Sequence, residues 1–307
     1  MKNFWKATLI PGLCCILVGG VLAIILVLGF SDELLEHAEE FSITEENYFD
    51  FLEGDRFENV NRGGERYGKA DTNASYHFAV PEEEMITGLN FAFAVGEVEI
   101  RTGDTMEVTV TDMFENAISA EVKDGVWYIE DSLLNSGSVH SSYSPEITIT
   151  IPKDVLFQKI DMYLAAGLMN VDELEAKQVS MEVDAGSLKV FELSAEEVLE
   201  IKNGVGEIIV YDAKAADLNV DNGIGAIAIT GEISGYNTIK CGIGEVKLQL
   251  TDRSSIDFNY EVECGIGEVE IGGRSYQGSS ENISFDRSNA DYFKLDCGIG
   301  HIVINVN

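Results

Sequence analysis

Basic side chains are scarce in this 307-residue chain, and their scarcity excludes several classes of partner. Only 20 lysines and arginines stand against 54 aspartates and glutamates, which gives a formal net charge of −34. Nucleic-acid binding needs lysine and arginine to neutralise phosphates, so no nucleic-acid partner is expected. The same argument disfavours docking onto anionic lipid headgroups. The expected partners are cationic, such as metal ions, amines or basic patches on other proteins.

Recognisable catalytic and metal-binding motifs are also absent. The four histidines are scattered, and the sequence contains neither H-E-x-x-H nor G-x-S-x-G. Cys-x-x-Cys spacing is missing as well. We therefore expect no catalytic residue and no cofactor. The alternative is a polysaccharide-active enzyme on a β-helix scaffold, which would need Asp, Lys and Arg side chains that converge in one groove.

The first thirty residues differ from the rest of the chain. Residues 7–30 carry no charged side chain, and a run of this length can cross about 30 Å of hydrocarbon. No small-x-small cleavage site follows, so an uncleaved transmembrane helix is predicted instead of a signal peptide. Lys2 and Lys6 mark residues 1–6 as a cytoplasmic stub, and the C-terminal domain is then expected outside the cell membrane. That exported part holds 18 basic and 54 acidic residues, a net charge of −36.

Residues 31–75 are interpreted as an acidic membrane-proximal stalk and linker. Acidic and apolar residues alternate at helical spacing over 31–54, and Ser31 can cap a short helix there. Residues 55–75 are polar and glycine-rich without an apolar period, which is typical of a linker. For 31–54, an amphipathic helix that binds a partner is the alternative.

After residue 75 no helical period occurs, and the apolar residues alternate with a period of two. Such alternation is typical of β-strands, and it is clear in the runs 88–100, 106–110, 125–130 and 146–152. The sequence therefore predicts a nearly all-β extracytoplasmic domain over 76–307.

A repeat of about 19–20 residues, centred on a Gly-x-Gly motif, organises this domain. The residues five before, one before, two after and four after the second glycine are apolar in the five clearest repeats. Period-two alternation within such a repeat predicts a β-solenoid, in which successive coils stack about 4.8 Å apart. The glycines are expected at corners, on either side of a buried β-branched residue. The predicted structural ladder comprises Gly204, Gly206, Gly223, Gly225, Gly242, Gly244, Gly265, Gly267, Gly298, Gly300, Cys241, Cys264 and Cys297.

One outward column supports stacking in sequence order. Four residues before the second glycine, the charge alternates through Lys202, Asp221, Lys240 and Glu263. Cross-strand ion pairs between such neighbours contribute about 0.2–1 kcal/mol each.

The three cysteines occupy one inward column of the predicted coils. Small buried thiols that fill a narrow corner are the preferred interpretation. A disulfide between stacked neighbours is an alternative, because an exported protein can oxidise. A metal site is a weaker alternative, since no histidine or fourth ligand accompanies the column.

An acidic outward column follows the second glycine. Glu245 and Glu268 are expected to be stacked neighbours, with Glu270 close by. A bridging Ca²⁺ could relieve their repulsion, which makes these three residues weak calcium candidates. A solvated acidic face, screened by Lys247, is the preferred interpretation.

The segments "ITGLNFAFAVGEVEIRTGDTMEVTV" and "ITITIPKDVLFQKIDMYLAAGLMNVDEL", followed by serial GxGEVxI coils, resemble a family of membrane-anchored bacterial β-strand-repeat proteins. The family is provisionally called adhesins, its function is unknown, and the resemblance covers 76–307. It implies a right-handed β-solenoid outside the cell, and some relatives lie beside envelope-stress systems.

From the anchor, the repeats and this resemblance we expect an adhesin-like binding or scaffold module of the bacterial envelope. Its partner would be an envelope protein, a cell-surface polymer or cations. The last strand, "IVINVN", would leave an open sheet edge. A homo-oligomer formed through that edge, in a self-assembling structural protein, is the second alternative.

Overall fold

The computed structural model describes residues 74–135, 143–153, 155–253, 256–278, 280–283 and 291–306, with backbone alone for 135 and 280–283. The predicted stub, transmembrane segment and nearly all of the predicted stalk lie outside these residues. Within the described part of the chain, no helix has the length and apolar character needed to span a membrane.

The described residues form an all-β fold, as predicted, with one short 3₁₀ turn, η1 (Ser132–Asn135). The N-terminal strands are β1 (Ala74–Ala79), β2 (Gly88–Phe93), β3 (Gly96–Gly103), β4 (Glu107–Met113), β5 (Ile118–Lys123), β6 (Val126–Asp131) and β7 (Glu146–Pro152). The remaining strands are β8 (Phe157–Ala216), β9 (Leu218–Ser234), β10 (Tyr236–Leu250), β11 (Asn259–Cys264), β12 (Glu268–Ile271), β13 (Arg274–Gln277), β14 (Ser280–Ile283) and β15 (Tyr292–Val306).

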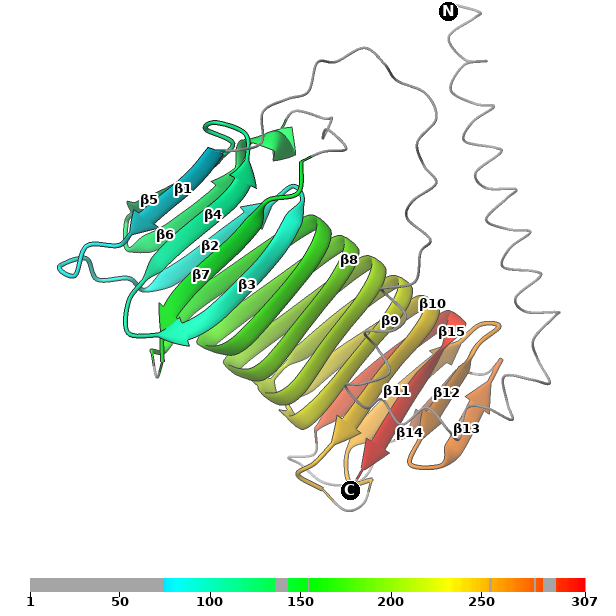
Figure 1. The fold of residues 1–307 in the computed structure, drawn as a ribbon. Helices are drawn as coiled ribbons and strands as arrows, with labels where there is room; N and C mark the ends of the chain where they lie inside the picture. The colour runs from blue at the N-terminus through cyan, green and yellow to red at the C-terminus, as the bar shows by residue number, and fades with distance from the viewer. Residues whose placement is uncertain are drawn as a thin grey trace, which may run out of the picture. The chain divides into compact units, whose positions relative to one another are not determined.

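The middle of the molecule is a stack of coils in sequence order. β8 is continuous over 60 residues and winds through successive coils, and β9 and β10 follow it as parallel neighbours (Figure 1). The bends stay in register, because Gly206 pairs with Gly225 and Gly225 pairs with Gly244. This arrangement agrees with the solenoid-like repeat predicted from the sequence.

The N-terminal end departs from sequence order. β2 and β3 pair in parallel with β8 on one side and with β6 and β7 on the other. The rung of β2 and β3 therefore lies between β8 and the rung of β6 and β7, although β6 and β7 come between β3 and β8 in the sequence. β5 then pairs antiparallel with β6, and β4 joins β7 to β1 by antiparallel pairing.

The C-terminal end shows the same departure. β15, red in Figure 1, lies between β10 and the rung formed by β11 and β12. The open edge predicted for "IVINVN" is therefore wrong, because this strand has parallel partners on both sides. β13 and β14, of four residues each, add antiparallel pairs to β12 and β11.

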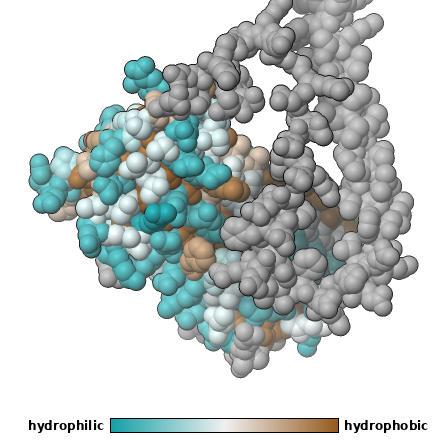
Figure 2. All heavy atoms as spheres, in the orientation of Figure 1, coloured by the Kyte–Doolittle hydropathy of each residue, from teal (hydrophilic) through white to brown (hydrophobic). Residues whose placement is uncertain are grey.

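The core lies inside the coils and is sealed by aromatic side chains near both ends. The buried column five residues before the bend consists of Ile201, Val220, Ile239, Leu295 and Val262. Phe91 contacts Trp127 edge-on at 5.6 Å near the N-terminal end, and Phe258 contacts Phe293 at 4.6 Å near the other. Hydrophilic residues cover much of the visible described surface, with hydrophobic residues interspersed (Figure 2).

Candidate binding surface

Each coil turns at its Gly-x-Gly bend, and backbone packing requires glycine there. In the middle coils the second glycine has a positive φ, 144° at Gly206, 134° at Gly225 and 126° at Gly244. Positive φ values favour glycine, because glycine has no Cβ. A Cβ built on Gly225 would lie 1.9 Å from the carbonyl oxygen of Gly206. The glycines therefore allow successive bends to approach closely.

The side chain between the two glycines points outward, so its predicted burial is wrong. The exposed fractions are 53% for Val205, 50% for Ile224, 41% for Ile243, 50% for Ile299 and 83% for Ile266. These large apolar side chains contact solvent in five coils. We call these five residues the β-branched ladder.

The outward orientation arises because the alternation changes phase at the bend. Asn222 is buried before one bend and Ile227 is buried after it, five residues later. Two inward positions separated by an odd number cannot belong to one unbroken period of two. The bend accommodates the additional residue, and Ile224 lies on the outer side of the turn.

The β-branched ladder is continuous along the stack. Val205 pairs with Ile224, Ile224 with Ile243, and Ile243 with Ile299. The backbone amide of Ile266, in the next rung, donates to the carbonyl of Gly298 at 2.9 Å. Five rungs at a spacing of about 4.8 Å give an apolar strip roughly 19 Å long.

An acidic column lies beside this strip, but its order differs from the prediction. His301 pairs in register with Glu245 on one side and with Glu268 on the other. The predicted contact between Glu245 and Glu268 is therefore wrong, because the rung of β15 separates them. His301 Nδ1 lies 3.8 Å from Glu245 Oε1. The column thus contains a histidine between two carboxylates.

The three weak calcium candidates do not form a cluster. Glu268 accepts a hydrogen bond from Ser275 Oγ, and this bond lowers the pKa of the carboxyl group. Glu270 and Lys247 both pair with Val303, from opposite sides, so the predicted proximity of that lysine is also wrong. Among the described residues, no group of three or more His, Cys, Asp or Glu is arranged to hold a metal ion.

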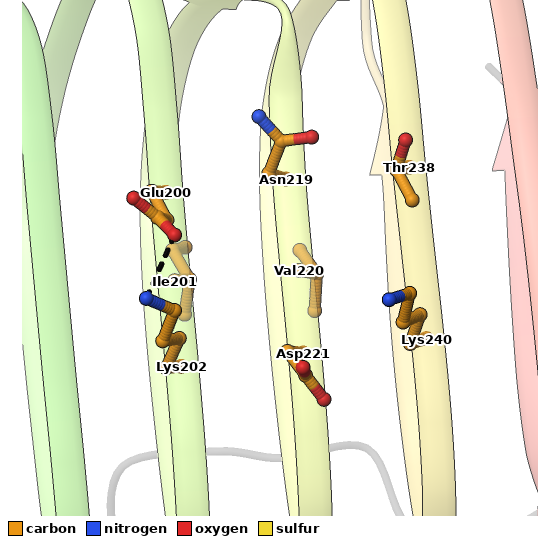
Figure 3. A pocket seen from close by; sticks show the side chains of 8 residues that line it. All are labelled: Glu200, Ile201, Lys202, Asn219, Val220, Asp221, Thr238 and Lys240. Carbon is orange, nitrogen blue, oxygen red and sulfur yellow. Dashed lines mark ion pairs between the residues drawn. The ribbon is translucent and has the colours of Figure 1, made fainter.

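The charged column four residues before the bend borders a shallow hollow of about 200 Å³ (Figure 3). The column runs Lys202, Asp221, Lys240, Asp296 and Glu263, since β15 again inserts before β11. Within the strand, Lys202 Nζ pairs with Glu200 at 2.8 Å. This pair raises the pKa of Lys202, and Asp221 adds a smaller electrostatic effect in the same direction.

Carboxylates and lysines do meet in this hollow, as the groove of a polysaccharide-active enzyme would require. Its volume is below the roughly 300–1,000 Å³ of typical ligand sites. Lys202 is also engaged by Glu200. The hollow is therefore a weaker candidate for function than the β-branched ladder.

The thiol column faces inward and changes order in the same way. Cys297 lies between Cys241 and Cys264, in register with both. Cys241 and Cys297 are buried, Cys264 is partly buried, and all three are free thiols. A hydrogen bond with Cys297 lowers the pKa of Cys241 to about 7 against the opposing effect of burial, whereas burial raises the pKa of Cys264.

Two stacked aromatic pairs on the surface were missed by the sequence analysis. Tyr236 and Tyr292 stack at 4.9 Å, and Phe191 and Tyr211 stack at 5.3 Å. The signal was present, because each member of a pair stands at the same distance from its own bend glycine. Tyr236 precedes Gly244 by eight residues, as Tyr292 precedes Gly300.

These features define an all-β, solenoid-like repeat protein whose bends present side chains in columns. The chain belongs to the Toastrack DUF4097 family, whose model matches residues 86–272. This match confirms the family resemblance drawn from the sequence. No curated protein matches the chain.

Several solved structures are similar to this chain at low identity. A protein from Clostridium sporogenes, provisionally named a cell adhesion protein, is 19% identical with a TM-score of 0.38, over 76% of this chain and 99% of its own. A provisionally named adhesin from Bacteroides fragilis is 14% identical with a TM-score of 0.36, over 75% and 96%. A provisionally named lipid-binding protein from Parabacteroides distasonis is 12% identical with a TM-score of 0.24, over 78% and 98%. These scores are too low to support an argument, so the family assignment rests on the family model.

Proposed function

We propose that this protein is a membrane-anchored, extracytoplasmic binding module of the bacterial envelope, which captures a partner on its β-branched ladder. The observation that carries the proposal is the exposure of five stacked β-branched side chains, four of them paired in register, in a strip roughly 19 Å long. An exposed contiguous apolar strip on a soluble surface is typical of an interaction site. Residues 7–30, which carry no charged side chain, supply the anchor.

The flanking side chains favour a basic partner. On one side of the strip the column carries Glu207, Glu245 and Glu268. On the other side stand glycines such as Gly223 and Gly242, which leave room for a partner to approach. Complementary charge steers encounter and selects the partner. A second copy of this acidic chain is therefore disfavoured as the occupant.

The spacing of the strip favours a helix as the recognised element. Rungs repeat about every 4.8 Å, and one turn of an α-helix rises about 5.4 Å. Apolar residues on one face of a helix can therefore lie between successive rungs over three to four turns. We therefore propose a basic amphipathic helix of another envelope protein as the partner segment, bound by its apolar face.

The test uses the full-length chain in detergent micelles and a designed 18-residue helical peptide with leucines on one face and lysines on the other. We expect binding, measured by fluorescence anisotropy, to weaken at least tenfold in the double variant Ile224→Gln/Ile243→Gln. Cells that display this variant should also retain less of the bound partner than cells that display the unchanged chain. A peptide with glutamates in place of the lysines should not bind.

The matched control changes the neighbouring face instead. Asn219→Ala/Thr238→Ala alters two side chains that line the hollow in Figure 3, in the same two coils as Ile224 and Ile243. This control should bind the basic peptide as the unchanged chain does. Equal affinity of the ladder variant and the control, or equal binding of both peptides, would refute the proposal.

A further inference from the structure

The three thiols form a row along the stack with Cys297 in the middle. Cys297 is the direct parallel partner of Cys241 in β10 and of Cys264 in β11. In-register neighbours on adjacent strands have Cα atoms about 4.8 Å apart. That separation lies within the range of roughly 4.4–6.8 Å found in disulfides. Either neighbour could therefore be bridged to Cys297 without moving a strand.

The sulfurs of Cys241 and Cys297 both lean toward the rung that follows theirs in the stack. Cys297 Sγ lies 3.7 Å from the carbonyl oxygen of Glu268, which belongs to the rung of Cys264. A Cβ built on Gly267, in that same rung, would lie 2.7 Å from Cys297 Sγ. Cys241 leans in the same direction, because a Cβ built on Gly300, in the rung of Cys297, would lie 2.7 Å from Cys241 Sγ. Cys297 also forms a hydrogen bond with Cys241. Either neighbour is therefore within reach of the central sulfur.

Access from solvent distinguishes the two neighbours, and it favours Cys264 with its in-register partner Cys297. Cys264 is partly exposed, whereas Cys241 is 2% exposed and Cys297 is 1% exposed. An oxidant that arrives from solvent can reach only Cys264 directly. Cys297 then lies behind it, in position to attack a sulfur that has been activated at Cys264.

We propose that Cys264 and Cys297 form a reversible disulfide by exchange with a small-molecule disulfide, while Cys241 stays a thiol. The Cys264 thiolate first attacks the oxidant, forms a mixed disulfide and releases one small thiolate. The Cys297 thiolate then attacks Cys264 Sγ, forms the protein disulfide and releases the second small thiolate. Two protein thiols are oxidised, one external disulfide is reduced to two thiols, and two protons pass from the protein to the released thiolates.

The bond would tie together two strands that are neighbours in space but not in order. It would link β11 to β15, and β15 is the strand that lies between β10 and the rung of β11. Parallel in-register Cβ atoms lie farther apart than a relaxed disulfide prefers, and strain makes such a bond easier to reduce. The pair is therefore suited to respond to the redox state outside the membrane, and this role does not depend on the β-branched ladder.

The test measures thiols in the full-length chain carrying Cys14→Ser and Cys15→Ser, so that only the three ladder cysteines remain. The protein in detergent is equilibrated with mixtures of oxidised and reduced glutathione, then denatured in an alkylating agent and weighed by mass spectrometry. We expect one alkylated cysteine in the oxidising mixtures and three in the reducing ones. Peptide mapping should then show Cys264 linked to Cys297 within one chain.

Serine variants identify the pair. Cys264→Ser and Cys297→Ser should each leave two alkylated thiols under every condition, whereas Cys241→Ser should still form the disulfide. Circular dichroism establishes that each variant is folded, since serine is close to cysteine in size. Three alkylated cysteines in every mixture, a bond between Cys241 and Cys297, or a bond between chains would overturn the proposal.

Discussion

The middle coils and the two ends of this molecule use the same kind of rung but connect it differently. From β8 through β10, each coil stacks on the coil that precedes it in sequence. At each end, one rung lies out of order. β2 and β3 lie between β8 and the rung of β6 and β7, and β15 lies between β10 and the rung of β11 and β12. The middle is therefore defined by local repetition, and the ends by contacts between distant segments.

The difference has a physical consequence for the sheet edges. An unbroken parallel solenoid would end in a row of unpaired backbone groups, which invites pairing with another chain. Here the terminal rungs carry short antiparallel strands instead, with β5 on β6, β13 on β12 and β14 on β11. Short strands are a common way to protect an edge. The irregular ends thus complete a regular stack.

The largest predicted effect is a glycine substitution in the middle coils. In Gly225→Ala the new Cβ would lie 1.9 Å from the Gly206 carbonyl oxygen, at a φ of 134°. Neither the close contact nor the strained φ can relax without moving a neighbouring rung. We therefore expect a loss of at least about 4 kcal/mol in the free energy of unfolding. Urea unfolding of the full-length chain in detergent, followed by circular dichroism, measures it.

The matched control lies at the C-terminal end. Gly273 has a φ of 80°, but nothing lies within 4 Å of a Cβ built there. Gly273→Ala should therefore cost only about 1 kcal/mol, from the backbone conformation alone. If the two substitutions cost the same, close packing of the bends does not explain the recurring glycines.

The middle coils were predictable because each residue type recurs at a constant offset from its own bend. Ile239 and Cys241 are buried before the bend, and Val246 and Leu248 are buried after it, as period-two alternation within each segment requires. The outward side chain of Ile224 was not predictable in this way. Its apolar character matched the core pattern, and the phase change depends on the backbone conformation at Gly225, which no count of apolar positions reveals.

The order of the last two rungs also could not be predicted. The segments around Cys264 and Cys297 both read C-G-I-G, so either could stack on the rung of Cys241 with similar local contacts. In the structure, the observed order of the rungs is accompanied by contacts between residues that are far apart in the sequence. Phe293 packs on Phe258, and Arg253 pairs with Asp291, the residue immediately before β15.

The second prediction concerns Arg253, which forms ion pairs next to the N-terminal end of β15, the strand that lies out of sequence order. Arg253 is 8% exposed in its side chain, pairs with Asp252 at 2.8 Å and Asp291 at 3.0 Å, and donates to the Ile233 carbonyl at 2.7 Å. Arg253→Met leaves the carboxylates of Asp252, Asp257 and Asp291 and the Ile233 carbonyl without this donor. We expect a loss on the order of 3 kcal/mol in urea unfolding, in the range for breaking a largely buried ion pair.

Its counterpart in the middle coils is Lys202, whose pair with Glu200 is solvent-exposed. Lys202→Met should change the free energy of unfolding by less than about 1 kcal/mol, since exposed ion pairs contribute little. The same ranking should appear in limited proteolysis, with cleavage near β15 accelerated only in Arg253→Met. Equal losses in the two variants would contradict the special role of ion pairing at the C-terminal end.

The smallest predicted effect is a pH dependence at the opposite end of the stack. Asp131 is 1% exposed, accepts hydrogen bonds from the Leu133 amide at 2.9 Å and the Tyr143 hydroxyl at 3.3 Å, and has a raised pKa because burial disfavours its charge. Above the ordinary carboxyl pKa near 3.8 the unfolded chain has released this proton while the folded chain still binds it. The contribution of Asp131 to stability must therefore fall as the pH rises through its raised pKa, and be largest in acid.

Asp131→Asn keeps the size of the side chain and removes the titration. The unfolding free energy of the variant, relative to the unchanged chain, should therefore increase as the pH rises from about 4 to 7 in the same urea titrations. Glu130→Gln, an exposed neighbour on the same strand, controls for the general loss of one negative charge and should show a flatter difference. If the Asp131→Asn difference is instead constant across this range, the buried carboxyl group does not titrate with folding, and the N-terminal end is held by packing around Trp127 and Phe91 alone.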